Sequence, residues 1–305
     1  KKLEQARVPG FLPDAPEVRK DLLDYALEVE WYDHHLGGML KALEEIGEMD
    51  NTLIVVTADN GMQFPRAMTT LYDAGTRMPL AIRWGDRMRA GRKIHDLVSF
   101  TDFAPTFLQA AGITPPEQMN GRSLVPLLTS QGQGGGGFRD HVIMGREHHH
   151  PKAESLRSRA IRTRRYLYIR NYNPGETWAG ELKGDYDPTT SMRSRRVMDE
   201  KDDYLDVDPS LTKNYMLRPE SKRRHHHLYQ MAFGPRPAEE LYDVRRDPDQ
   251  LHNLACIPGH EKVVNRLSKR LEAELKRTED PRALGRPEVF ENYFDQEWLR
   301  QWGSK

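Results

Sequence analysis

A short apolar run at residues 52–57 (TLIVVT) constrains the fold more than any other feature of the chain. An uninterrupted apolar stretch of this length is typical of a strand buried on both faces, as in a parallel sheet flanked by helices. The run leads directly into Asp59, Asn60 and Gly61. Because ligands of open α/β sheets bind beyond the carboxyl ends of the strands, we expect Asp59 and Asn60 to lie at a functional site.

Further regular segments surround this run. Apolar residues recur at spacings of three and four from residue 14 to residue 48, which predicts a helix. Gly37 and Gly38 weaken that helix by about 1 kcal/mol each relative to alanine. We expect a second strand at 78–84 and another helix at 101–111.

A glycine-rich stretch, QGQGGGG at 131–137, separates two parts of the chain. We place a linker at 131–139, with one portion at 1–130 and a smaller one at 140–305. Residues 175–235 show no clear periodicity. The expected elements of the second portion are an amphipathic helix at 260–277 and strands at 141–145, 159–163, 166–171 and 239–244.

Composition excludes several classes of protein. The 46 Lys and Arg residues equal the 46 Asp and Glu residues, so net charge favours neither nucleic acid nor a membrane surface. No apolar run reaches the roughly 20 residues that span a bilayer. The single cysteine, Cys256, excludes an internal disulfide and a cysteine-based zinc site. The N-terminus lacks an initiator methionine and an apolar signal, so we expect the chain to begin in mid-protein, and export stays open.

The segment TADNG at 57–61 resembles the metal-binding turn of the type I sulfatases, in the alkaline-phosphatase superfamily. Asn-Gly alone is a common turn dipeptide, but five more segments are similar to family motifs in the family's order. They are LYDAGTRMP at 71–79, SFTDFAPT at 99–106, NGRSLVPL at 120–127, AIRTRRYLY at 160–168, and ELYDVRRDP at 240–248 with NLA at 253–255. The chain is thus identified as the C-terminal part of such a sulfatase. The resemblance implies an α/β sheet flanked by helices with a smaller α+β subdomain of antiparallel sheet plus helix.

Two shorter segments narrow the branch. QFPR at 63–66 and GREHH at 145–149 resemble the heparan N-sulfatase (sulfamidase) branch and its bacterial relatives. The resemblance implies a sulfated, glycosaminoglycan-type saccharide as substrate and a periplasmic, secreted or lysosome-like location. It leaves the oligomeric state open.

Asp59 and Asn60 offer a carboxylate and an amide oxygen, which are hard donors suited to Ca²⁺. The resemblance implies that both bind one calcium ion, which would draw negative charge from a sulfo group under attack. A neutral asparagine suits a monoanionic sulfate, whereas phosphatase relatives generally place Asp-His at this turn. An ordinary turn after a strand is the alternative reading.

The family's nucleophile is a formylglycine made from the Cys or Ser of C/S-x-P-x-R, which acts with an Asp-Asp pair. The chain contains neither that motif nor the Asp-Asp pair of the family's first strand, since CIPGH at 256–260 only mimics the motif. We therefore expect the nucleophile in an N-terminal segment that is absent here, and we assign no catalytic residue in this chain.

Substrate contacts are expected from both portions of the chain. Many sulfatases have a sulfate-binding lysine where this chain has Met68, and a thioether carries no charge. Arg66 is the candidate replacement, or else an ordinary surface arginine. The resemblance implies that His149 reaches the substrate, and Arg146 and Glu147 either hold sugar hydroxyls or pair with each other.

The sequence leaves three functions open. The first is hydrolysis of a sulfate ester or N-sulfate of a glycosaminoglycan-type sugar. The second is phosphoester or phosphonate hydrolysis on the same fold, against which Asn60 argues. The third is a non-catalytic, sugar-binding relative, which Met68 favours.

Overall fold

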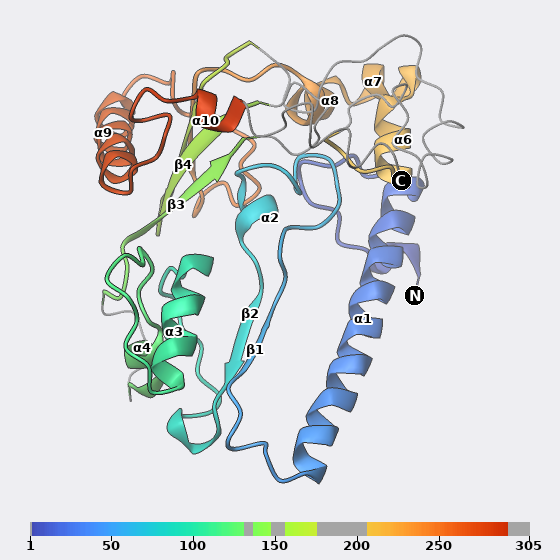
Figure 1. Cartoon of the computed structure of the whole chain (residues 1–305). Helices are drawn as coiled ribbons and strands as arrows, with labels where there is room; N and C mark the ends of the chain where they lie inside the picture. The colour runs from blue at the N-terminus through green and yellow to red at the C-terminus, as the bar shows by residue number, and fades with distance from the viewer. Residues whose placement is uncertain (1, 131–136, 148–155, 176–205, 292–305) are drawn as a thin grey trace, which may run out of the picture.

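The computed structural model of the chain describes residues 2–130, 137–147, 156–175 and 206–291 (Figure 1). A long helix is followed by a two-stranded sheet with short helices and then by a four-stranded sheet covered by a further helix. The helices are η1 (Leu3–Gln5), α1 (Pro16–Glu45), α2 (Asp73–Thr76), η2 (Gly85–Arg87), η3 (Phe100–Asp102), α3 (Phe103–Ala110), α4 (Val125–Thr129), α6 (Leu211–Leu217), α7 (Pro219–Arg224), α8 (His226–Phe233), α9 (Glu261–Arg277) and α10 (Glu288–Glu291). The strands are β1 (Ile54–Thr57), β2 (Leu80–Arg83), β3 (His141–Arg146), β4 (Ser158–Thr163), β5 (Tyr166–Asn171) and β6 (Glu239–Asp243).

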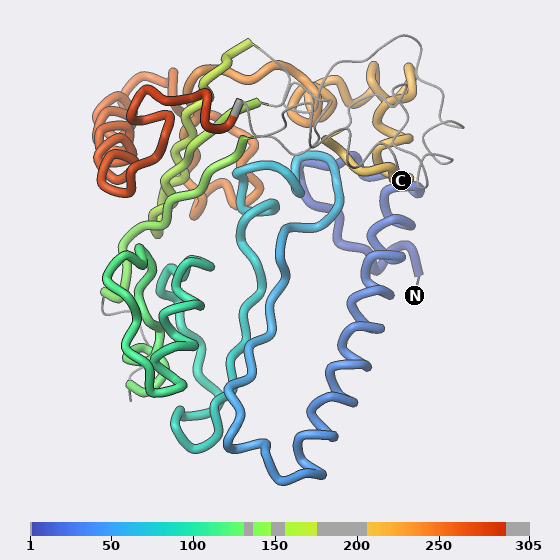
Figure 2. Tube along the Cα trace, in the orientation of Figure 1, coloured from blue at the N-terminus to red at the C-terminus, as the bar shows by residue number. Residues whose placement is uncertain are grey.

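Helix α1 begins and ends close to the predicted limits. A proline suits its first position, because the missing N–H would have no helical partner there, and Gly47, with a φ of 76°, follows the last turn. The helix runs unbroken through the glycine pair at 37–38. Only Val18 of α1 is fully buried. The start of the helix packs against α6, and Figures 1 and 2 show the rest extending away from that contact.

None of the helices in the described ranges combines the length and apolar character needed to cross a membrane.

Strand β1 confirms the predicted strand, but its neighbour runs in the other direction. β1 pairs with β2 in an antiparallel register that places Ile54 opposite Arg83 and Thr57 opposite Leu80. The expected parallel arrangement is therefore wrong for this pair. All four residues of β1 are half-buried and most of β2 is exposed. An apolar run indicates a tendency toward burial and carries no information about the direction of the neighbouring strand.

The C-terminal sheet has the order β3-β4-β5-β6, with every pair antiparallel. All four strands fall where the sequence predicts them, and β6 lies at one edge of the sheet. Side chains alternate between the two faces of a sheet, so each face forms its own core. One face packs on α9 through Ile161, Tyr168 and Leu241. The opposite face, with Leu167 and Ile169, packs on the segment that contains Leu71 and Tyr72.

A third core joins the beginning of the chain to its later part. Phe11, Leu12 and Val18 pack in one cluster with Met216 and Phe233 of α6 and α8. Residues on both sides of the expected linker at 131–139 therefore share a core. The division of the chain at that linker stays a prediction.

Candidate functional site

The turn after β1 directs two oxygen donors outward. Asp59 and Asn60 are both exposed. The Asn60 amide nitrogen Nδ2 donates to the Gly61 carbonyl at 2.9 Å, and the Asn60 backbone N–H donates to Asp59 Oδ1 at 2.9 Å. Because the nitrogen of the Asn60 amide is already engaged, its oxygen is the atom presented to a ligand. The turn thus offers a carboxylate and an amide oxygen side by side, which fits a hard cation.

Two glycines hold this turn against α2. The Gly61 N–H donates to the Gly75 carbonyl at 3.2 Å. A Cβ added to Gly61 would lie 2.1 Å from the Ala74 carbonyl oxygen, and one added to Gly75 would lie 2.3 Å from the Ala67 carbonyl oxygen. The backbones therefore approach more closely than any side chain allows.

Asp59 and Asn60 line a cleft of about 1220 Å³ between β2 and the segment around α2, the loop at 88–100 with α4, and the C-terminal sheet. Several arginines also line it. Arg162 and Arg164 are paired with Asp73 and Asp96. Two further arginines, at positions 77 and 245, form no ion pair within the described ranges, so the cleft offers free positive charge to an anion.

Arg66, expected to contact the substrate, lies in the interior and does not line the cleft. Its Nη1 donates to the Met231 carbonyl at 3.2 Å, its Nη2 donates to the Gln250 carbonyl, and its Cζ lies 3.9 Å from the centroid of the Tyr72 ring. Burial acts to lower the pKa of Arg66, but Tyr72, Tyr242 and Glu240 outweigh burial and raise the pKa above its ordinary value. The guanidinium that an anion would use is thus bound to backbone carbonyls and an aromatic ring inside the protein.

Met68 lies half-buried in a strained loop. Its N–H donates to the Met62 carbonyl at 3.1 Å. Arg66 and Thr69, on either side, both have a φ of 65°, which is unfavourable for residues other than glycine and is worst for a β-branched residue. Such strain is found where the surrounding structure fixes the backbone, often near functional sites.

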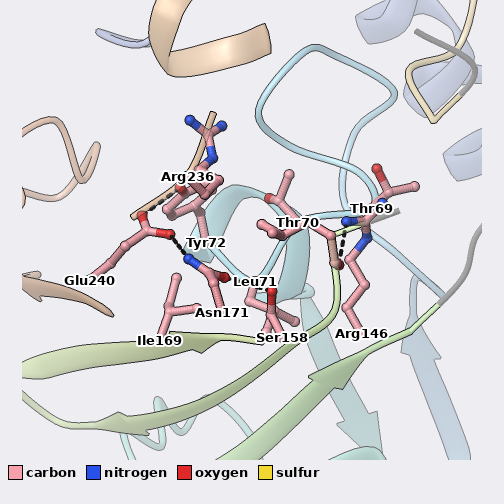
Figure 3. A pocket seen from close by; sticks show the side chains of 11 residues that line it. Thr69, Thr70, Leu71, Tyr72, Arg146, Ser158, Ile169, Asn171, Arg236 and Glu240 are labelled. Atoms are coloured by element: carbon pink, nitrogen blue, oxygen red, sulfur yellow. Dashed lines mark hydrogen bonds between the residues drawn. The ribbon is translucent and has the colours of Figure 1, made fainter. Parts of the chain in front are cut away.

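Arg146 is the last residue of β3 and Glu147 follows it, and neither lines the cleft. Arg146 donates to the Leu156 carbonyl at 2.8 Å and pairs with buried Asp206. Arg146 lines a separate small pocket of about 20 Å³, and Glu240 lines the opposite side of the same pocket (Figure 3). The structure therefore does not bring Arg146 together with Asp59 and Asn60.

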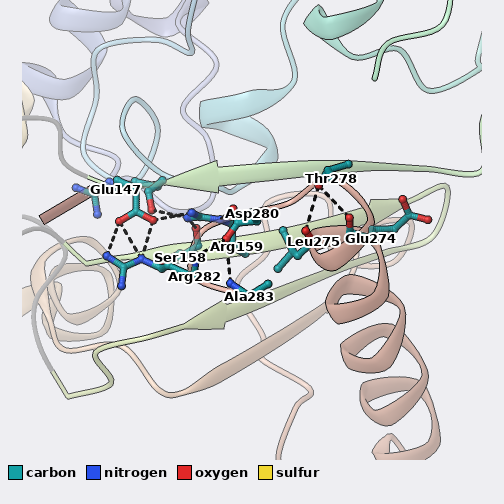
Figure 4. Close-up of polar contacts among 10 residues, drawn as sticks. Glu147, Ser158, Arg159, Glu274, Leu275, Thr278, Asp280, Arg282 and Ala283 are labelled. Atoms are coloured by element: carbon teal, nitrogen blue, oxygen red, sulfur yellow. Dashed lines mark hydrogen bonds and ion pairs between the residues drawn. The ribbon is translucent and has the colours of Figure 1, made fainter. Parts of the chain in front are cut away.

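Glu147 forms ion pairs with Arg159 at 2.6 Å and with Arg282 at 2.7 Å (Figure 4). Its carboxylate is thus bound by two arginines of this chain, which competes with the expected contact to a sugar hydroxyl. His149 lies outside the described residues.

Sequence reasoning did not identify the residues that support the turn. Asp73 and Arg162 form a bidentate ion pair, and the Gln250 side chain accepts the Asp73 N–H at 2.8 Å. Asp73 and Arg162 each lie in a segment recognised as a family motif, at 71–79 and at 160–168, which was the available signal. These segments and Gln250 are far apart in the sequence, so nothing local indicates the contact.

The α/β architecture, the turn after β1 and the antiparallel C-terminal sheet define a protein of the alkaline-phosphatase-like sulfatase class. The chain matches the family model for sulfatases at residues 4–113 and the model described as N-sulphoglucosamine sulphohydrolase, C-terminal, at residues 66–216. The chain belongs to the type I sulfatase family, in its sulfamidase-like branch, as the sequence motifs indicated.

Individual relatives agree with this assignment. An ulvan-active sulfatase of Formosa agariphila is 29% identical over 93% of this chain and 43% of the relative. Human N-sulphoglucosamine sulphohydrolase is 26% identical over 90% of this chain and 51% of the relative. The solved structure of BT4656 in complex with its substrate D-glucosamine-2-N,6-O-disulfate superposes with a TM-score of 0.59 at 25% identity, covering 88% of this chain and 44% of BT4656. The chain spans about half the length of these relatives.

Proposed function

We propose that this chain supplies part of the active site of a sulfatase that hydrolyses a sulfate ester or N-sulfate on a glycosaminoglycan-type sugar. The observation that carries the proposal is the pair of oxygen donors, Asp59 and Asn60, presented to a cleft with two arginines that form no ion pair with any residue the structure describes. The human relative is an N-sulphoglucosamine sulphohydrolase, and BT4656 was solved with a sulfated glucosamine. A sulfated glucosamine, as found in heparan sulfate, is thus the proposed substrate, and an exported or lysosomal location suits it.

Asp59 and Asn60 are the proposed ligands of one calcium ion. When bound, the ion would withdraw negative charge from the sulfo group. Calcium takes roughly six to eight oxygen ligands, and the described ranges hold no group of three or more His, Cys, Asp or Glu side chains suited to a metal. The remaining ligands and the formylglycine nucleophile are therefore proposed to come from an N-terminal segment.

Exposed apolar side chains support that N-terminal segment as a partner. Trp31 and Met39 of α1 are 62% and 65% exposed, and Leu80 of β2 is 38% exposed. Tyr25, Leu27, Val29 and Tyr32 of α1 are exposed as well, and large apolar patches on a surface mark interaction sites. We propose that the segment packs between the free side of α1 and the β1–β2 hairpin, which would place its nucleophile near Asp59.

Arg77 is the proposed cation for the sulfo group, because Met68 provides no charge. Arg77 follows α2, shortly before the strand that pairs with β1, and lines the same cleft as Asn60. A guanidinium can donate two parallel hydrogen bonds to sulfate oxygens. Arg66 as the replacement stays a prediction, which its buried position does not support.

The test uses the longer protein that includes the formylglycine. Desulfation of N-sulfo-glucosamine and of 6-O-sulfo-glucosamine is measured for wild type, Asp59→Ala and the control Asp86→Ala, an exposed aspartate on η2. We expect turnover and calcium binding to be lost in Asp59→Ala alone. Full activity in Asp59→Ala would refute the site, and turnover of the 6-O-sulfate alone would refute the sulfamidase assignment.

A non-catalytic, sugar-binding relative is the second candidate, and Met68 is the observation that favours it. Met68→Lys decides between the two. If the wild type is an enzyme, it turns over sulfated glucosamine without that lysine. If only Met68→Lys is active, or neither protein is, the binding function is supported. A higher rate on a phosphate monoester than on sulfate would instead support phosphoester or phosphonate hydrolysis.

A further inference from the structure

The ion pair between Asp73 and Arg162 joins α2 to the C-terminal sheet. Arg162 Nε donates to Asp73 Oδ1 at 2.8 Å, and Arg162 Nη2 donates to Asp73 Oδ2 at 2.8 Å. The two side chains are only 14% and 13% exposed. A bidentate, charge-assisted pair with little access to water fixes both distance and orientation. Asp73 is therefore held in one place relative to β4.

Two more contacts attach the start of α2 to the same part of the protein. The Asp73 N–H donates to Gln250 Oε1 at 2.8 Å. The hydroxyl of Tyr72, one residue earlier, donates to Glu240 of β6 at 2.7 Å. Helix α2 thus begins at a point held by β4, β6 and the loop after β6.

The other end of this four-residue helix contacts the turn at Asp59 and Asn60. Gly75 accepts the Gly61 N–H at 3.2 Å, and an added Cβ at Gly61 would lie 2.7 Å from Gly75 Cα. No side chain separates the two backbones, so a shift of α2 moves the turn at Asp59 and Asn60. Packed interiors transmit such displacements because they have little free volume.

We propose that Arg162 is a positioning residue for the turn at Asp59 and Asn60. It contacts neither residue and acts through Asp73, α2 and the Gly61–Gly75 contact. The C-terminal sheet thereby sets the geometry of a site that lies on the hairpin of the first portion. The importance of Arg162 for catalysis rests on the proposed function. The mechanical coupling between Arg162 and the turn does not.

Hydrogen–deuterium exchange of this chain tests the coupling without any activity assay. The backbone amides of residues 59–62 are compared in wild type, Arg162→Gln, Arg162→Lys and Arg165→Gln. Arg165 provides a matched control, because it lies in the turn that follows β4, pairs with Asp243 and does not line the cleft. We expect exchange at 59–62 to accelerate about tenfold or more in Arg162→Gln, less in Arg162→Lys, and not at all in Arg165→Gln.

Two results would overturn the proposal. One is wild-type exchange at residues 59–62 in Arg162→Gln. The other is acceleration spread evenly over the whole C-terminal sheet, which would indicate a purely structural role. If Arg162→Gln does not fold, Asp73→Asn, which keeps the side-chain volume, is measured in its place with the same expected outcome.

Calcium binding, measured on the protein that includes the proposed N-terminal segment, tests whether Arg162 affects the proposed metal site at Asp59 and Asn60. Titration with Ca²⁺ alone should show binding weakened about tenfold in Arg162→Gln, with partial recovery in Arg162→Lys, because a displaced turn cannot present both oxygens. Unchanged calcium affinity would refute the positioning role. If exchange responds but even the wild type binds no calcium, the coupling stands and the proposed metal site fails.

Discussion

The guanidinium of Arg66 stacks on the ring of Tyr72, and the Tyr72 hydroxyl donates a 2.7 Å hydrogen bond to Glu240. Glu240 also accepts from the Tyr242 hydroxyl at 2.7 Å and from Asn171 Nδ2 at 2.9 Å. This carboxylate is only 3% exposed. A buried polar cluster of this kind stabilises the fold only while every member keeps its partners.

Glu240→Gln should therefore destabilise the chain. The new amide presents a donor where three donors converge, which leaves at least one buried polar group unpaired at a cost of about 1–3 kcal/mol. Urea unfolding followed by circular dichroism measures the change in the free energy of unfolding. The control Glu45→Gln, on an exposed part of α1, should change it by less than about 0.5 kcal/mol. Equal stabilities of Glu240→Gln and wild type would contradict the importance of the cluster.

Glycine-to-alanine substitutions at two positions should have opposite effects. Alanine at Gly75 would place its Cβ 2.3 Å from the Ala67 carbonyl oxygen, so we expect a loss of about 1–3 kcal/mol. Alanine at Gly37 meets nothing within 4 Å on an exposed helix and should stabilise by about 0.5–1 kcal/mol. Thermal and urea unfolding of both variants checks the signs. A neutral Gly75→Ala would mean that α2 moves freely.

Acid should weaken the contact between Asp140 and α9. Hydrogen bonds from His141 and then from Arg270 lower the pKa of Asp140 to about 2. Because the folded pKa lies below the unfolded value of about 3.9, this carboxylate stabilises the fold fully above that value. Its contribution is lost as the pH falls through about 2.

The stability difference between wild type and Asp140→Asn should accordingly be constant between about pH 4.5 and pH 5.5 and shrink between about pH 4 and pH 2. Urea midpoints at a series of pH values measure it. The exposed Asp33 of α1 forms no ion pair in the described part of the chain, so Asp33→Asn should show no such trend. A difference that grows with acid would contradict the ion pair.

The exposed face of α1 should make this chain self-associate when it is produced without further segments. Trp31 and Met39 are more than 60% exposed, and their replacement by lysine removes apolar surface without touching a core. Sedimentation velocity of Trp31→Lys/Met39→Lys should show more monomer than wild type, with unchanged circular dichroism. The control Glu44→Lys alters charge on the same helix and should leave association as it is. Identical sedimentation of all three proteins would argue against an apolar interface.

Regular elements with several repeats of a pattern could be predicted from the sequence. The helix expected at 260–277 is α9, and the strand expected at 166–171 is β5. By contrast, α6, α7 and α8 each have eight residues or fewer, which gives too few turns for a 3.6-residue period to emerge. Met216 of α6 and Phe233 of α8 pack against Phe11, Leu12 and Val18 of this chain, and no local sequence pattern reveals a contact between residues so far apart.

The candidate site likewise contains residues whose location could be predicted from the sequence and one whose location could not. Asp59 and Asn60 follow an apolar strand, so their exposure at its end was predictable. The location of Arg66 was not, because its partners are backbone carbonyls of Met231 and Gln250, which any sequence provides. A single sequence does not distinguish an arginine that awaits an anion from one that secures a loop.

The core shared by Phe11, Val18, Met216 and Phe233 limits how this polypeptide can be divided. Cleavage in the glycine-rich stretch would leave two pieces that each carry half of one apolar interior. Residues 2–130 produced alone should then be degraded by proteases or captured by chaperones, and adding residues 140–305 in trans should rescue them. The two parts that the glycine-rich stretch joins would then belong to a single folding unit.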